Sequence, residues 1–332
     1  MMTTHHWTVS ISTPDWRESA EFGRATALLE RGELVAIPTE TVYGLAADAT
    51  NGQACARIFE AKGRPRFNPL ISHVPDYATA QNHGIFNDDA DKLAKHFWPG
   101  PLTLVVPRKK TSPISELATA GLDTVALRVP ASPLMQTLSQ TLNRPLAAPS
   151  ANLSGRLSPT TGADVAKDMN GRIGMVIDTG PTAIGLESSI VACVSAQPVL
   201  LRPGGIPAED ISQVLAKELK RTVSDDTAPA APGMLSSHYA PNALVRMDAR
   251  EVGLNEGLLA FGPHMADGAQ YCREVHNLSE QSDLREAASR LFTGLRLLDV
   301  SGVERIAVMP IPKTGLGEAI NDRLKRAAAP RK

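Results

Sequence analysis

The sequence of 332 residues is poor in cysteine and in long apolar runs, and each shortage excludes a class of protein. Its three cysteines, Cys55, Cys193 and Cys272, are far apart and form no Cys-x-x-Cys pair, which predicts reduced thiols rather than a disulfide framework. No run reaches the roughly 18 apolar residues of a membrane span, and no basic region followed by an apolar stretch opens the chain. We therefore expect a soluble, cytoplasmic protein that contacts no membrane.

Neither sign of charge is in excess, because 34 Lys and Arg residues face 35 Asp and Glu residues. Aromatic residues make up just 4% of the chain, few for stacking on nucleic-acid bases. Bulk composition thus gives no sign of a nucleic-acid binder, although a local basic patch remains allowed. The sequence also lacks Gly-x-x-x-x-Gly-Lys-Ser/Thr, His-Glu-x-x-His and Gly-x-Ser-x-Gly, which disfavours kinase-like ATPases, zinc hydrolases and serine esterases.

The length and the 42% of apolar residues are sufficient for two domains with separate cores. Residues 222–232 are rich in Ala, Pro, Ser, Thr and Asp, a composition typical of a linker. We expect a first, larger domain over residues 12–220, a linker over 221–242 and a small α/β domain over 243–332. His5 and His6 are expected to lie in a disordered tail.

The most informative stretch runs from Ile37 to His73 and predicts a strand, a polar turn, a helix, a basic loop and a second strand. Asn51 can cap the helix, and Gly63 with Pro65 ends it. Further helices are expected at 16–30, 88–97, 133–142, 207–219, 283–298 and 316–328. Further strands are expected at 102–106, 124–129, 146–148, 175–177, 188–194, 199–201, 243–247, 258–261 and 305–309.

Lys62, Arg64 and Arg66 place three cations on this one stiff loop. A guanidinium offers donors in a fixed fork that fits phosphate oxygens, and an ammonium adds a point charge. The alternative is a solvated last helical turn, where the macrodipole favours cations. Because glycine and proline stiffen the loop and a polar turn precedes it, the pattern favours an anion site.

Arg128 lies between Leu127 and Val129 within an apolar strand, and such a charge is seldom buried without a partner. Its partner is expected to be a carboxylate, and the sequence leaves open whether the protein or a ligand supplies it. A second polar cluster, which includes Ser150 and Asn152, follows the strand at 146–148. Gly315-Leu316-Gly317 completes no phosphate-binding motif, so we interpret it as a plain junction between a loop and a helix.

Eight motifs, in family order from about Thr39 to Pro241, resemble those of the two-domain threonylcarbamoyl-AMP synthase family with a YrdC-like N-terminal domain. They are Pro-Thr-Glu-Thr-Val-Tyr-Gly-Leu, Lys-Gly-Arg-Pro-x-x-Asn-Pro-Leu-Ile-x-His, Trp-Pro-Gly-Pro-Leu-Thr, Ala-Leu-Arg-Val-Pro, Ser-Ala-Asn-x-Ser-Gly, Leu-Glu-Ser-Ser, Leu-Arg-Pro-Gly and Pro-Gly-Met-x-x-x-His-Tyr-Ala-Pro. The departures, Ser189 for threonine and Ala231 for serine, change no charge. The resemblance implies an α/β fold: a YrdC-like twisted mixed sheet with flanking helices around a concave basic cavity, plus a small Rossmann-like domain.

The resemblance also implies an activity, the synthesis of threonylcarbamoyl-AMP and pyrophosphate from L-threonine, bicarbonate or carbon dioxide, and ATP with Mg²⁺. The product serves tRNA threonylcarbamoyladenosine modification through a downstream transferase complex. Carried over by position, the catalytic residues are Lys62 and Arg64. The ATP-binding residues are Arg64, Asn68, Thr124, Ser150, Asn152, Thr160, Arg202 and Tyr239. The threonine-binding residues are Thr41, His73, Arg128, Ser150 and Ser188, with Arg128 on the carboxylate, and no protein metal site is implied.

Two other functions use the same features. The basic concave surface suits an RNA-binding module, with weak RNA binding as a further interaction of the synthase, and related domains occur in a carbamoyl-phosphate-dependent carbamoyltransferase. Neutral net charge and few aromatics disfavour the first, and missing acylphosphatase and zinc-finger segments disfavour the second. Residues 232–241 contain Met234, His238 and Tyr239, which a flexible spacer does not need, so we expect this segment to act as a lid over the nucleotide.

Overall fold

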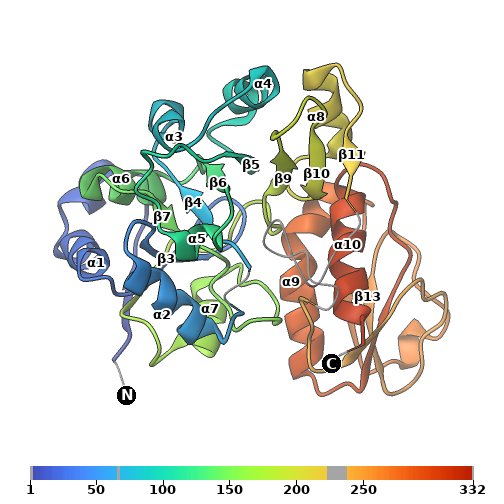
Figure 1. The fold of residues 1–332 in the computed structure, drawn as a ribbon. Coiled ribbons are helices and arrows are strands. Elements are labelled where there is room, and N and C mark those ends of the chain that lie inside the picture. The colour runs from blue at the N-terminus through green and yellow to red at the C-terminus, as the bar shows by residue number, and fades with distance from the viewer. Residues whose placement is uncertain (1–2, 66–67, 223–237, 331–332) are drawn as a thin grey trace.

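The computed structural model describes residues 3–65, 68–222 and 238–330 and contains two sheets (Figure 1). The large sheet has 11 strands in the order β1-β8-β2-β3-β7-β4-β6-β5-β9-β10-β11 and mixes parallel with antiparallel pairs. Its strands are β1 (His5–Thr8), β2 (Val35–Ile37), β3 (Gly44–Asp48), β4 (Ile71–His73), β5 (Leu102–Pro107), β6 (Thr124–Arg128), β7 (Leu146–Ala147), β8 (Met175–Asp178), β9 (Ser189–Ala192), β10 (Val199–Arg202) and β11 (Lys220–Arg221).

Short helices flank this sheet, and most of them begin at a side-chain cap. They are a 3-10 turn (Pro14–Glu18), α1 (Ala20–Glu30), α2 (Gly52–Lys62), α3 (Tyr77–His83), α4 (Asp88–Phe97), α5 (Glu116–Thr119), α6 (Pro133–Leu142), α7 (Gly162–Met169) and α8 (Ala208–Leu215). Asn51 accepts hydrogen bonds from two amides of the first turn of α2, and Gly63 ends that helix at φ 59°. The predicted start and end of α2 are therefore confirmed, as are the bounds of α4 and α6.

Several predicted elements differ from the structure. The helix expected at 16–30 is a 3-10 turn followed by α1, because Ser19 is extended and caps Ala20–Glu30. The helix expected at 207–219 ends at Leu215, because the next residue, Ala216, is left-handed with φ 52°. His5 and His6 do not lie in a disordered tail: they belong to β1, which pairs in parallel with β8.

The segment Gly44–Asp48, which the sequence predicts as part of a polar turn before a helix, forms strand β3. The strand is buried throughout and pairs antiparallel with β2, so it lacks the alternation by which a half-exposed strand is recognised. Helices α3 and α7 and strand β14 were missed as well.

The C-terminal sheet has the order β12-β15-β13-β14, with all neighbours parallel. Its elements are β12 (Leu244–Arg246), β13 (Glu256–Ala260), a 3-10 turn (Ala269–Tyr271), β14 (Glu274–Asn277), α9 (Leu284–Val300), β15 (Arg305–Val308) and α10 (Leu316–Ala328). The α/β character predicted for this part is confirmed. Gly317 lies so near the Pro312 carbonyl that a Cβ would be 1.9 Å from its oxygen, which supports a plain junction at Gly315-Leu316-Gly317.

The two parts share a core. Leu157 and Leu186 of the N-terminal part pack in one cluster with Tyr239 and Phe292. At Gly185, where φ is 73°, a Cβ would lie 2.5 Å from the Ser289 Cα, so this contact requires glycine. Figure 1 shows α9 and α10 beside the end of the large sheet that carries β9 and β10. The predicted domain boundaries stay predictions, and most of the predicted linker, residues 223–237, lies outside the described residues.

Candidate active site

A small cavity of about 40 Å³ lies beside the ends of several strands of the large sheet, and we call it the polar cavity. It is lined by Thr41, Val42, Arg64, Ile71, His73, Arg128, Ala148, Pro149, Ser150, Glu187, Ser188, Arg202, His238 and Tyr239. The predicted site residues among them are Thr41, Arg64, His73, Arg128, Ser150, Ser188, Arg202 and Tyr239. The structure brings these residues together, and the ligand that each would bind stays a prediction.

Strand pairing explains why residues far apart in sequence meet here. Strands β4 and β6 are parallel, and their register places His73 opposite Arg128 at the carboxyl ends of both. Strand β9 runs antiparallel to β10, so Ser188, just before β9, lies beside Arg202 at the end of β10. The Arg202 guanidinium donates to the Ser188 carbonyl, at 2.9 Å from Nη2, and to its hydroxyl at 3.2 Å.

Three buried arginines make the polar cavity suitable for an anion. Arg64, Arg128 and Arg202 are each less than 10% exposed. Arg64 Nη2 donates to the carbonyls of Asn68 and Pro69, whereas its Nε has no partner among the described residues. Burial, with a further contribution from Arg202, lowers the pKa of Arg64 to about 10, so the group is still a cation at neutral pH. An anion beside these groups would offset the cost of their burial.

The predicted cation Lys62 has a different place in the structure. Its Nζ donates to the backbone carbonyls of Ser150 and Asn152, at 2.5 Å each, and its side chain does not line the polar cavity. Burial lowers the Lys62 pKa well below its ordinary value, and the nearby Arg64 charge adds to this effect. Lys62 therefore holds the turn that presents Ser150. Arg66 lies outside the described residues.

Arg128, for which two kinds of carboxylate partner were left open, pairs with one from the protein. Its Nη2 is 2.6 Å from Glu40 Oε1, and its Nε donates to the Gly100 carbonyl at 3.2 Å. The other carboxylate oxygen of Glu40, Oε2, is buried without a partner among the described residues. The ion pair orients the guanidinium toward the cavity wall that it shares with His73.

Both histidines of the polar cavity are neutral at physiological pH. Burial lowers the pKa of His73 to about 3, helped by the adjacent Arg128 charge. Burial likewise lowers the pKa of His238 to about 3. The negative charge of Glu187 acts to raise this pKa, whereas the positive charges of Arg64 and Lys62 lower it further. The Nδ1 atoms of both rings have no partner within the described part of the chain. Each ring can therefore hydrogen-bond a ligand without adding charge.

Two charged residues with no predicted role, Glu187 and Arg323, belong to this environment. Glu187 Oε1 accepts from the Ser158 hydroxyl at 2.5 Å, and Oε2 is 2.8 Å from Arg323 Nε. Burial raises the pKa of Glu187, but the charges of Arg323 and Arg202 outweigh this and lower it to about 2. The sequence could have indicated Glu187 as a site residue, because it lies in the Leu-Glu-Ser-Ser motif. No motif indicates Arg323, which lies in an ordinary helical sequence.

The other predicted residues do not line the polar cavity. Asn152 donates to the carbonyls of Leu153 and Arg156 and so closes its own loop. Thr160 lies 3.1 Å, hydroxyl to hydroxyl, from Thr293 of α9. The remaining two are Asn68, whose buried Oδ1 lacks a partner in the described ranges, and Thr124, which begins β6, the strand that ends at Arg128.

Tyr239 connects the polar cavity with the C-terminal part. Its ring is 1% exposed, lies 5.6 Å from the Phe292 ring and has the Arg323 guanidinium 5.3 Å from its centroid. Tyr239 has φ 60°, and the next amide, that of Ala240, donates to the Gly155 carbonyl at 2.8 Å. The rest of the proposed lid, residues 232–237, lies outside the described residues.

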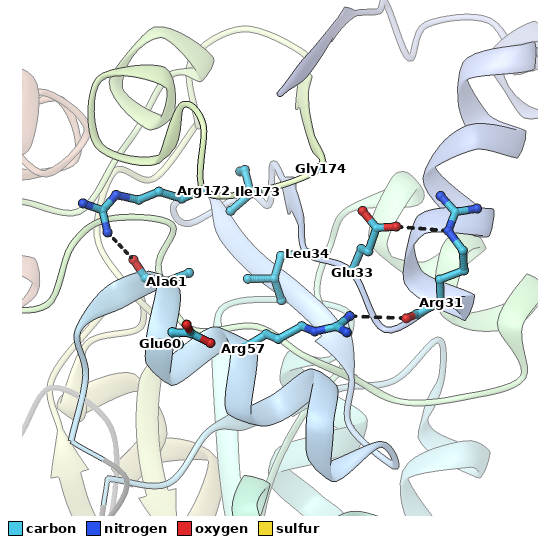
Figure 2. A pocket seen from close by; sticks show the side chains of 9 residues that line it. All are labelled: Arg31, Glu33, Leu34, Arg57, Glu60, Ala61, Arg172, Ile173 and Gly174. Carbon is cyan, nitrogen blue, oxygen red and sulfur yellow. Dashed lines mark hydrogen bonds and ion pairs between the residues drawn. The ribbon is translucent and has the colours of Figure 1, made fainter. Parts of the chain in front are cut away.

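A larger cavity, of about 710 Å³, lies elsewhere, and we call it the arginine cavity. Figure 2 shows its walls: Arg31, Glu33, Leu34, Arg57, Glu60, Ala61, Arg172, Ile173 and Gly174. Its arginines are exposed and bonded to the protein. Arg57 Nη1 donates to the Gly32 carbonyl at 2.7 Å, and Arg31 Nε is 3.0 Å from Glu33. None of the buried polar atoms that lack partners in the described residues belongs to this cavity.

In the described ranges, no helix has both the length and the apolar character that crossing a membrane requires. Within the same ranges, no group of three or more histidine, cysteine, aspartate or glutamate side chains could hold a metal ion.

A mixed α/β sheet whose strand ends converge on buried cations, hydroxyls and neutral imidazoles is typical of proteins with a pocket for small anionic and polar ligands. Family comparisons specify it further. A profile described as telomere recombination, for the Sua5, YciO and YrdC proteins, matches residues 27–204, and the profile of the C-terminal domain of threonylcarbamoyl-AMP synthase matches 206–329. The chain belongs to the two-domain threonylcarbamoyl-AMP synthase family.

Individual relatives support this assignment over the whole length. The threonylcarbamoyl-AMP synthase of Bacillus subtilis is 40% identical, with 99% of each chain covered. That of Pyrococcus abyssi is also 40% identical, with 97% of this chain and 98% of the relative covered. The crystal structure of Pyrococcus abyssi Sua5 complexed with L-threonine superimposes with a TM-score of 0.88 at 37% identity and covers 98% of both chains.

Proposed function

We propose that this enzyme makes threonylcarbamoyl-AMP and pyrophosphate from L-threonine, bicarbonate or carbon dioxide, and ATP. The observation that carries the proposal is the polar cavity itself, in a chain that matches the models of both domains of the family, over residues 27–204 and 206–329. Buried cations there suit a nucleotide phosphate and a carboxylate, while hydroxyls and neutral imidazoles suit a small hydroxylated amino acid.

Threonine is assigned to the wall built by Thr41, His73, Arg128, Ser150 and Ser188. Arg128 would take the amino acid's carboxylate. Its bond to Glu40 supports this role, because a guanidinium held at Nη2 and Nε can present its remaining donors in a fixed direction. The neutral ring of His73 would hydrogen-bond the substrate without repelling its ammonium group.

ATP is assigned to other residues of the same cavity, with Arg64 and Arg202 at the phosphates and Tyr239 beside the nucleotide; we call these three residues the nucleotide wall. The other proposed nucleotide ligands are Asn68, Thr124, Ser150, Asn152 and Thr160. Lys62 stays in the catalytic set with a modified role, since its bonds to two carbonyls hold the turn that carries Ser150. Mg²⁺ would arrive with ATP as part of the substrate. Glu40 and Glu187, the carboxylates near the cavity, already face arginines.

The chemistry proceeds in two steps, both of them between small molecules. The threonine ammonium group first releases a proton to solvent, and the neutral amine then attacks carbon dioxide. A nitrogen–carbon bond forms, one carbon–oxygen π pair moves to oxygen and the nitrogen releases a second proton to solvent, which yields a carbamate. A carbamate oxygen then attacks the α-phosphorus of ATP, and the bond to the β-phosphate oxygen breaks, so pyrophosphate leaves with the electron pair. Since carbamate and triphosphate repel each other, the enzyme's contribution is positioning and neutralisation by Arg64 and Arg202.

The defining experiment measures pyrophosphate release with each substrate omitted in turn, together with mass spectrometry of the product. We expect release only when threonine, bicarbonate and ATP are all present, and a product with the mass of threonylcarbamoyl-AMP. Pyrophosphate release at the same rate with and without threonine would refute the proposal, and so would carbamoyl transfer from carbamoyl phosphate.

Finer points belong to the same proposal. The four parallel strands of the C-terminal part support a Rossmann-like domain, and the three arginines support a concave basic cavity in the YrdC-like domain. We propose the domain boundaries predicted above, a cytoplasmic location and a downstream tRNA threonylcarbamoyl transferase complex that takes the product. Weak RNA binding is a further proposed interaction.

A further inference from the structure

Arg323 combines features that helix packing alone does not require. It lies on α10, the last helix of the chain, and its side chain is fully buried. Burying a guanidinium is costly unless it is well paired, and a hydrophobic side chain would fill the same space at less cost. A buried arginine that contacts the wall of a ligand cavity therefore suggests a role beyond packing.

The contacts of Arg323 lead to the polar cavity. Its Nε is 2.8 Å from Glu187 Oε2, and Glu187 lines the cavity. Its guanidinium carbon lies 5.3 Å from the centroid of the Tyr239 ring, which also lines the cavity. A second carboxylate comes from Asp322, which is on the same helix as Arg323; its Oδ2 lies 2.7 Å from Arg323 Nη1. One arginine from the C-terminal part thus contacts two residues that line the polar cavity, one of which, Tyr239, is assigned to the nucleotide.

The place of Glu187 shows what this contact accomplishes. The Glu187 carboxylate accepts from the Ser158 hydroxyl at 2.5 Å and pairs with Arg323 on its other side. In the chain, Glu187 directly precedes Ser188, whose carbonyl accepts a hydrogen bond from Arg202. Without Arg323, a buried anion would lose its principal partner beside a proposed triphosphate site. The segment that carries Ser188 would then be free to shift, and with it the alignment of Arg202.

We infer that Arg323 is a positioning residue of the active site, by which the C-terminal part holds Glu187, Tyr239 and through them the nucleotide wall in place. The inference rests on the proposed function, and it gives the C-terminal part a role in arranging the active site. Arg323 itself does not line the polar cavity. It acts through the two residues that it contacts.

The test compares Arg323→Met, Arg323→Lys and the double variant Glu187→Gln/Arg323→Met in the full chain. Pyrophosphate release is measured with ATP and with threonine varied separately, and ATP binding is measured by calorimetry. Lys325→Ala is the matched control, because Lys325 is exposed on the same helix. For Arg323→Met we expect kcat/KM for ATP to fall about 100-fold or more, as for other broken buried ion pairs, with less than about a threefold change in KM for threonine.

Arg323→Lys keeps the charge but loses the fork, so it should recover about one tenth of wild-type efficiency. Glu187→Gln/Arg323→Met contains no unpaired buried charge and should be no worse than Arg323→Met, while Lys325→Ala stays within about twofold of wild type. Equal changes in both Michaelis constants, or multiplicative losses in the double variant, would overturn the inference.

The experiment separates a folding defect from a failure of the proposed function. If Arg323→Met does not fold in thermal melts, the decisive comparison is between Glu187→Gln and the double variant. Their kcat/KM values for ATP should agree within about threefold, and a much lower value for the double variant would contradict a role through Glu187. If wild-type enzyme binds ATP but releases no pyrophosphate, the proposed function fails. The order of ATP dissociation constants among the variants still decides the role of Arg323.

Discussion

The polar cavity and the arginine cavity use the same charged side chain in opposite ways. In the polar cavity, about 40 Å³ in volume, arginines are buried and Arg64 Nε has no partner among the described residues. In the arginine cavity, about 710 Å³ in volume, the arginines are exposed and bonded to carbonyls or to Glu33 (Figure 2). Cavity volume therefore is not the basis on which we propose an active site. The basis is the set of buried donors without partners in the described residues, because a ligand that satisfies such donors gains the most.

The largest expected effect is at Arg64, the arginine with an unused donor. Arg64→Ala should lower pyrophosphate release about 100- to 1000-fold, the usual cost of one preorganised charge, while thermal unfolding changes little. Steady-state rates at saturating threonine and bicarbonate provide the measurement. Turnover at the wild-type rate would show that the unused donor serves no phosphate, and the contrast between the cavities would disappear.

Arg128 tests the threonine wall and should show the next largest effect. Arg128→Ala removes a charged hydrogen bond worth roughly 1.5–3 kcal/mol, so KM for threonine should rise about 10- to 150-fold while KM for ATP changes far less. Because Glu40 loses its partner, Arg128→Ala/Glu40→Gln is the matched control and should restore stability but not threonine affinity. If both Michaelis constants rose together, Arg128 would be structural.

The buried histidines of the polar cavity should make the free energy of unfolding depend on pH. His73 has a folded pKa of about 3, against about 6.5 in an unfolded chain, so between these values the unfolded state binds one more proton. The unfolding free energy should therefore decrease as pH falls below 6.5, by about 1.4 kcal/mol per pH unit for this residue. Denaturant titrations at pH 7 and pH 5 should show a smaller decrease for His73→Asn. An identical decrease would mean that His73 is not buried and neutral.

The smallest effect is expected in the arginine cavity. Arg57 is exposed and donates to the Arg31 and Gly32 carbonyls just after α1, so Arg57→Ala should leave both Michaelis constants and kcat within about twofold. Stability should change by about 0.5 kcal/mol or less. A loss comparable with that of Arg64→Ala would assign a function to the larger cavity.

Local signals explain which elements were predictable. Helix α4 has the bounds predicted for it. Its start is fixed by the Asn87 cap and an acidic first turn, which are local features of the sequence. Strand β3 was missed because Gly-Leu-Ala-Ala carries no alternation, and burial on both faces depends on partners far away in the chain. Likewise, β1 depends on β8, some 170 residues later.

The chain alone determined the motifs, and with them the family and eight of the residues that surround the polar cavity, because strand ends and glycine–proline turns are local features. Tertiary structure alone decided the partners. It pairs Arg128 with Glu40, turns Lys62 toward two carbonyls and brings Arg323 to Glu187 across 136 residues of sequence. Those choices follow from desolvation, since a buried charge must bind whichever opposite group the fold places beside it, and no local pattern records that neighbour.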